Sequence, residues 1–170
     1  MKYLFVAFGC AALFCVTAAG QTGTLSKSDQ EFIDMAAQTD MLEARLGQLV
    51  QDQASSQKVK DYAQMLVTDH TADYNQVSAL ATKVGGTVPK GLDKAGDRMV
   101  APFTKAKGTA FDHRYVHDMV AGHTKAIAAY KHENEHTQNA DIKAYINQTL
   151  PTLEKHLQGA QDLEKEKPSS

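Results

Sequence analysis

Cysteine is nearly absent from this chain of 170 residues: there are two, Cys10 and Cys15, and both lie among the first twenty residues. The rest of the chain therefore has no thiol for a disulfide and must be stable through packing alone. It also lacks a Gly-x-Ser-x-Gly motif and a glycine loop of the kind that cradles phosphate. No sequence signal therefore supports nucleophilic catalysis.

Long apolar runs are missing too, except for one near the N-terminus. Lys2 precedes an apolar run from Tyr3 to Val16 that is too short to span a bilayer. Thr17-Ala18-Ala19-Gly20 then offers small residues for cleavage. This pattern predicts a secretory signal peptide over residues 1–20 and an exported mature chain with no transmembrane segment.

An excess of positive charge is also lacking. Without Lys2 the chain has seventeen basic and twenty acidic side chains. The two signs are interspersed, and no basic stripe appears. We therefore expect no nucleic acid among its partners.

Four segments place apolar residues at steps of three and four, the period of a helix with one buried face. None alternates with period two, so the predicted fold is all-α: an antiparallel four-helix bundle over residues 28–165, between a flexible leader (21–27) and a disordered tail (166–170). The long connection between helices two and three, with a short helix of its own, favours the ferritin-like arrangement over simple up-down-up-down. The expected helices are 28–54, capped by Ser28; 57–84, capped by Ser56 and ended by Gly85-Gly86; about 92–99; 110–136, capped by Thr109; and 140–163, capped by Asn139.

One polar residue interrupts the apolar face of each long helix: Glu43, His70, His123 and His156. Each lies near the middle of its helix, and helices of similar length packed side by side bring their midpoints to one level. We therefore expect the four side chains to meet in one layer of the core. A carboxylate and three imidazoles there can bind one divalent metal ion, such as zinc, copper, iron or manganese.

Other polar residues on these helices are candidates for orienting the imidazoles: Asp69, Tyr115 and Thr149, with Thr39 and Tyr74. The alternative is a closed hydrogen-bond network without metal, in which Glu43 accepts from two imidazoles and the third bonds Tyr115 or Thr149. The cost of burying charged groups favours the metal. The other histidines are expected on solvated faces: His113, His117, His132 and His136.

The combined motifs resemble those of domain of unknown function 4142, a family of exported bacterial proteins with a ferritin-like fold. The motifs are Met65-x3-Asp69-His70, Phe111-Asp112-x2-Tyr115-x3-Met119-x3-His123 and Leu150-Pro151-x4-His156. The resemblance covers about residues 28–163 and implies a location in the periplasm or peripherally at the outer membrane. It implies no activity.

Ferritin-like di-iron proteins carry a Glu on two helices and Glu-x-x-His on the other two. Here the two paired motifs read Val67-x-x-His70 and Leu153-x-x-His156, and only Glu43 remains as a carboxylate. One metal ion is therefore the most that the resemblance supports.

Two functional classes remain open. The first is a metal-binding protein with a role in envelope stress or metal handling. The second is a non-catalytic periplasmic interaction or structural protein whose interior Glu and His layer is a hydrogen-bond network. A metal-dependent oxidase is a more distant third, and the sequence does not favour an enzyme. An envelope protein or a second copy of the chain remains open as a partner.

Overall fold

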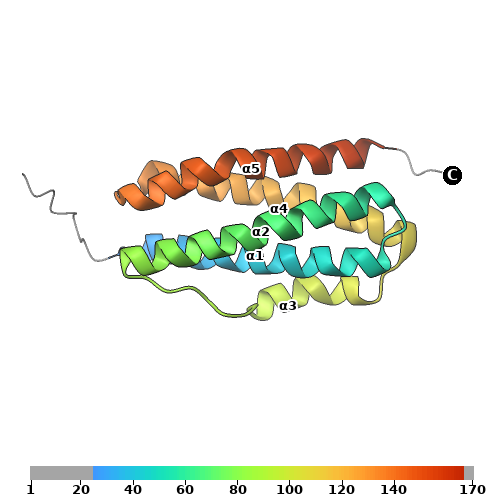
Figure 1. Cartoon of the computed structure of the whole chain (residues 1–170), viewed down its shortest axis with the longest axis horizontal. Helices are drawn as coiled ribbons and strands as arrows, with labels where there is room; N and C mark the ends of the chain where they lie inside the picture. Colours follow the sequence, from blue (N-terminus) through green and yellow to red (C-terminus); the bar gives the residue numbers. More distant parts are fainter. Residues whose placement is uncertain (1–24, 167–170) are drawn as a thin grey trace, which may run out of the picture.

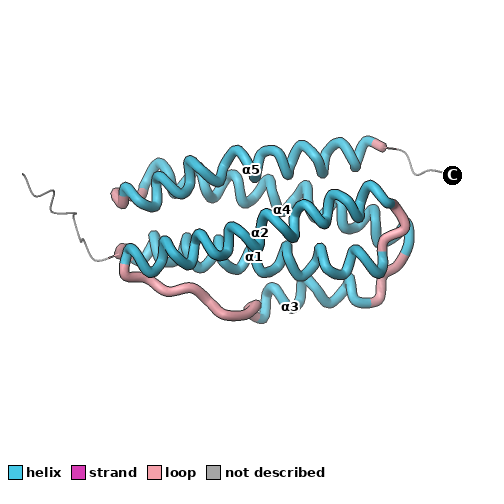
Figure 2. The backbone as a smooth tube through the Cα atoms, in the orientation of Figure 1, coloured by secondary structure: helices cyan, strands magenta, loops and turns pink. Residues whose placement is uncertain are grey.

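The computed structural model describes residues 25–166, and within them every regular element is helical, as predicted (Figure 2). The predicted signal peptide, residues 21–24 of the leader and residues 167–170 of the tail lie outside the described residues. The elements are α1 (Lys27–Gln53), α2 (Gln57–Val84), α3 (Lys94–Val100), the 3-10 helix η1 (Ala101–Thr104), α4 (Gly108–His136) and α5 (Ala140–Lys165). In the part of the chain described, none of these helices combines the length and apolar character needed to cross a membrane.

The four long helices lie side by side, and the short α3 packs against α1 (Figure 1). α1 packs mainly on α2, and α4 mainly on α5; the two pairs meet through α2 with α5 and α1 with α4. α1 and α5 run in one direction, α2 and α4 in the other, so each helix is antiparallel to both neighbours. The connection over residues 85–107 allows this because it returns along the molecule before α4 begins.

The apolar core is divided into two clusters along the helices. One draws on residues 32–37, 77–81, 126–130 and 142–153. The other draws on residues 46–54, 59–66, 100–119 and 160. Each long helix therefore has a short stretch between the two clusters, and the predicted polar residues lie in these stretches.

Capping interactions explain most of the helix boundaries. Ser56 accepts a hydrogen bond from the backbone N–H of Val59, and Asn139 accepts from the first N–H groups of α5, so both predicted caps are confirmed. Gly85 ends α2 with a φ of 77°, a conformation that glycine adopts without a Cβ penalty.

Two other predicted caps are wrong. α1 begins at Lys27, in the predicted leader, because Ser26 rather than Ser28 forms the capping box with Asp29. Thr109 does not cap α4, which begins at Gly108, two residues earlier than predicted, with Lys107 at the N-cap position.

Asp112 of α4 holds the turn between α1 and α2. Its carboxylate accepts hydrogen bonds from the backbone N–H of Ser55 at 3.1 Å and of Ser56 at 2.9 Å. A side chain from α4 therefore satisfies backbone groups where α2 begins.

α1 and α2 approach each other closely at one glycine. A Cβ on Gly47 would lie 2.5 Å from Cγ2 of Val67 and 3.1 Å from the carbonyl oxygen of Ala63. The absence of a side chain there lets the two helices pack closely.

Candidate metal centre

Three histidines from three helices meet in the middle of the core. His70 of α2, His123 of α4 and His156 of α5 are each at most 2% exposed. Their ring centroids are 5.2 to 5.7 Å apart. One nitrogen of each ring lies within 4.8 Å of one nitrogen of both other rings. These three side chains could hold a metal ion.

Each imidazole is anchored through one ring nitrogen. Nδ1 of His70 lies 2.8 Å from Oδ1 of Asp40 on α1. Nε2 of His156 lies 2.9 Å from Oδ2 of Asp69, and Nδ1 of His123 donates to the carbonyl oxygen of Met119 at 2.9 Å. Carboxylates and carbonyls that hold a ring in this way fix its orientation and its tautomer.

The second nitrogen of each ring has no hydrogen-bond partner among the described residues. These atoms are Nε2 of His70, Nε2 of His123 and Nδ1 of His156. One buried polar atom without a partner costs about 1–3 kcal/mol, so three in one cluster are hard to explain by stability alone. In a neutral His123 that donates through Nδ1, the Nε2 atom carries a lone pair, which is the group that ligates a metal.

Burial keeps the three imidazoles neutral. It is the main cause that lowers the pKa of His123 to about 3, and the neighbouring His70 adds to the effect. Burial likewise lowers the pKa values of His70 and His156. Because a ligating imidazole must be unprotonated, the cluster is already in the form that binds a cation.

Glu43 is buried beside the histidines but does not join the close group of nitrogens. It is 4% exposed, and its Oε2 atom has no partner among residues 25–166. Burial raises its pKa to about 7, although His70 acts in the opposite direction. No hydrogen bond joins Glu43 to the three histidines, so the closed network that the sequence left open is not formed around it.

Of the side chains predicted to orient the imidazoles, one does so: Asp69 bonds His156 across the α2–α5 contact. The others bond elsewhere or not at all. Thr149 donates to Asp73 at 3.3 Å, Thr39 to the carbonyl of Met35 and Tyr74 to the carbonyl of Pro89, and the buried hydroxyl of Tyr115 has no partner in the described chain.

Sequence reasoning missed two buried carboxyl groups, Asp40 and Asp73. Burial, and then the charge of Asp73, raises the pKa of Asp40 to about 9. Burial also raises the pKa of Asp73, whose carboxylate accepts from the hydroxyl of Tyr145 at 2.8 Å. The available signal was position: each lies three residues from a predicted site residue, Glu43 or His70, and so on the same helix face.

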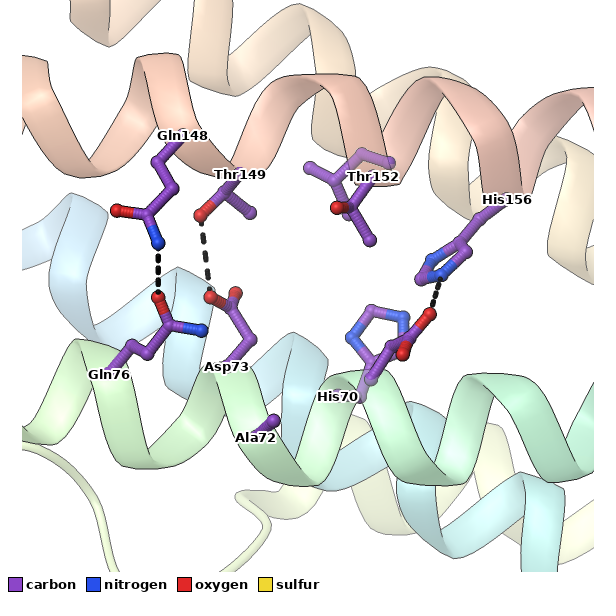
Figure 3. Close-up of a pocket in the computed structure, with 10 residues that line it drawn as sticks. His70, Ala72, Asp73, Gln76, Gln148, Thr149, Thr152 and His156 are labelled. Carbon is purple, nitrogen blue, oxygen red and sulfur yellow. Dashed lines mark hydrogen bonds and ion pairs between the residues drawn. The ribbon is translucent and has the colours of Figure 1, made fainter.

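A cavity of about 200 Å³ lies between α2 and α5 and reaches two of the histidines (Figure 3). Its walls carry Asp69, His70, Ala72, Asp73 and Gln76 from α2, and Gln148, Thr149, Thr152, Leu153 and His156 from α5. The histidine cluster is therefore buried but adjoins a hollow on one side of the molecule.

No curated protein and no solved structure matches this chain. A family model does match, over residues 15–163. That match confirms the resemblance seen in the motifs around the three histidines. The chain belongs to the family described as Domain of unknown function (DUF4142).

Proposed function

We propose that this protein binds one divalent metal ion through His70, His123 and His156. The proposal rests on one observation. In each of the three imidazoles, one ring nitrogen is hydrogen-bonded and the other is buried without a partner. Three neutral imidazoles oriented by carboxyl groups and a carbonyl are a donor set suited to zinc, copper, iron or manganese.

Three protein ligands leave a further coordination position on the ion. Two nitrogens bound to one tetrahedral zinc are about 3.4 Å apart, given bonds of about 2.0–2.1 Å. The nitrogens here lie within 4.8 Å, so small side-chain rotations would bring them onto one ion. We assign Glu43 to the further position, directly or through a water molecule, because its Oε2 atom is buried without a partner.

We include a ferritin-like four-helix bundle in the proposal. Its support is the parallel course of α2 and α4, joined by a long connection, with each long helix antiparallel to its neighbours. We propose one ion and not two, although Asp40 and Asp73 are buried nearby. The close group of donor atoms in the described chain contains the three histidines alone.

The biological role that we propose is metal handling or protection in the cell envelope, in the periplasm or peripherally at the outer membrane. Its support is the predicted signal peptide and the resemblance to exported proteins. Catalysis is not part of the proposal.

A structural role is the second candidate, and the Asp40–His70 hydrogen bond favours it. Buried polar pairs can fix the register of packed helices even where no ligand is bound. In that case the polar layer would align α1 with α2, and α2 with α5, in an interaction protein of the envelope.

Thermal melts of tag-free protein, stripped with a chelator, separate the two candidates. A bound ion should raise the melting temperature, since a ligand held only by the folded state adds about 2.7 kcal/mol at a hundred times its dissociation constant. Zinc, copper, manganese and ferrous iron would each be added, and the metal content of freshly purified protein would be measured.

Alanine variants assign the effect to the cluster. His70→Ala and His123→Ala should abolish the metal-dependent gain, while His132→Ala, on the exposed face of α4, should keep it. If none of the four ions changes the melting temperature, and the purified protein contains no metal, the structural role is the one supported.

A further inference from the structure

We propose that the cavity between α2 and α5 is the route by which a divalent cation reaches the three histidines, and that Asp69 and Asp73 receive the ion on the way. The inference rests on the proposed function of the histidine cluster. It adds the path, and the residues that line it, to the ligands already assigned.

The cavity has an outer end and an inner end. Gln76 and Gln148 are exposed, and their side chains bond each other at 3.2 Å between α2 and α5 at one end of the cavity. His70 and His156 are buried at the inner end, and both have an unpartnered ring nitrogen (Figure 3). The cavity therefore links solvent to two of the three proposed ligands.

The lining suits a hydrated cation. It has two carboxylates, two amides and two hydroxyls, and none of its ten residues is Lys or Arg. Oxygen donors of this kind replace the water shell of a divalent ion, whereas an anion would meet only like charge from Asp69 and Asp73. The volume of about 200 Å³ is large enough to hold water molecules together with an ion.

Asp69 occupies the decisive position on this route. Its side chain is 35% exposed, yet it lies 2.9 Å from Nε2 of the almost completely buried His156. The carboxylate that an incoming ion meets is thus the one that holds a proposed ligand. An ion that loses water to Asp69 is already beside the imidazole that binds it next.

Along the helix axes the described core is mainly apolar, apart from the buried chain of hydrogen bonds from Asp73 through Tyr145 to Tyr130. Beyond the histidine layer, in both directions, the described residues form apolar clusters that include Ile33 and Ile146 on one side and Leu66 and Phe111 on the other. A cation crossing either cluster would lose its water without compensation. The side opening between α2 and α5 avoids this cost.

The test is the rate of metal exchange, compared with its equilibrium. Apo-protein would be mixed with Zn²⁺, and separately with Cu²⁺, in a stopped-flow instrument, with a coloured chelator reporting free ion. Thr152→Trp places an indole in the cavity, and Ala72→Phe obstructs it from the opposite wall. Thr124→Trp makes the same change as Thr152→Trp at an exposed position of α4 and is the matched control.

Both obstructing variants should slow association and dissociation by about tenfold or more, because the ion must then wait for a local opening of the helices. Their dissociation constants should stay within about threefold of wild type, since the ligands are unchanged. Asp73→Asn should slow association severalfold at low salt, by removing an attractive charge from the path.

The outcomes are distinguishable. If wild type binds metal and both obstructing variants exchange it as fast as Thr124→Trp, the route is overturned and the proposed function stands. If Asp73→Asn alone keeps the wild-type rate, the receiving role of Asp73 is overturned. If wild type binds neither ion, the route and the proposed function fall together.

Discussion

Nδ1 of His70 and Oδ1 of Asp40 lie 2.8 Å apart, and each side chain is only 2% exposed. This hydrogen bond joins α1 to α2 in the layer between the two apolar clusters. Burial raises the pKa of Asp40 to about 9 and lowers that of His70, so a proton shared within the pair leaves it without net charge. The pair is therefore a structural contact between the two helices, and it also holds one proton that it can release.

Asp40→Ala should weaken folding and metal binding together. The substitution leaves Nδ1 of His70 buried without its partner, which costs about 1–3 kcal/mol of unfolding free energy. Loss of a group that orients a ligating histidine lowers metal affinity by about 10–100-fold. Urea unfolding and Zn²⁺ titration measure the two effects. Asp52→Ala, at an exposed position of α1, is the control and should change neither.

Metal binding at pH 7 should release about one proton or more. Asp40, with a pKa near 9, and part of the Glu43 population, with a pKa near 7, hold protons in the metal-free core. A divalent charge beside them favours the ionised carboxylates and drives these protons off. Calorimetric titrations in buffers of different ionisation enthalpy count them. Asp40→Asn should lower the count by about one, and an unchanged count would contradict this assignment.

The metal-free protein should be most stable in mildly acidic solution. Burial raises the pKa of Asp40 to about 9 and of Glu43 to about 7, so both carboxyls hold protons in the folded chain that the unfolded chain has lost above about pH 4. The stability that they contribute is complete below about pH 4 and is lost as pH rises through 7 and 9.

The histidines act in the opposite direction. The pKa of His123 is lowered to about 3, and those of His70 and His156 are lowered too, so below about pH 6.5 the unfolded chain binds protons that the folded chain does not. The two effects partly offset each other between about pH 4 and 6.5, where three histidines oppose two carboxyls. Above pH 7 the unfolding free energy should fall by roughly 1 kcal/mol per pH unit.

Urea unfolding in the presence of a chelator, from pH 5 to pH 9, measures this profile. Glu43→Gln should flatten the part of the decline near pH 7 and leave the part that follows Asp40. Stability that rises from pH 6 to pH 8 would show that the buried carboxyls are ionised in the folded protein.

The sequence predicted the helices and the three histidines because both follow from one periodicity. A histidine on an apolar stripe is conspicuous, so His70, His123 and His156 could be placed in a common layer before any coordinates. Asp40 was missed because the apolar face predicted for α1 ran through Ala36, Thr39, Leu42 and Leu46. The buried face in the structure also takes in Ala37, Asp40 and Gly47.

The cavity could not be predicted at all. It depends on the distance between α2 and α5, which side chains from both helices set together. The contact of Asp112 could not be predicted for a similar reason, because the Ser55 and Ser56 N–H groups that it bonds are distant in sequence.

Gly47→Ala should destabilise the protein although alanine is the better helix former. The gain in helix propensity is about 1 kcal/mol. The new Cβ would meet Cγ2 of Val67 at 2.5 Å, and overpacking of this kind costs about 1–3 kcal/mol. Gly122→Ala, where the nearest atom is 3.5 Å away, is the comparison and should be neutral or stabilising. Thermal melts decide, and equal effects at both sites would contradict the close approach of α1 and α2.

The long connection between α2 and α4 divides the chain into two halves of similar construction. α1 with α2, and α4 with α5, are two hairpins, and the cluster takes His70 from the first and His123 and His156 from the second. The histidine cluster therefore lies at the interface between the two hairpins. An ion bound there would act as a non-covalent cross-link, so that a chain cut at the exposed Lys90 could still be held together by metal.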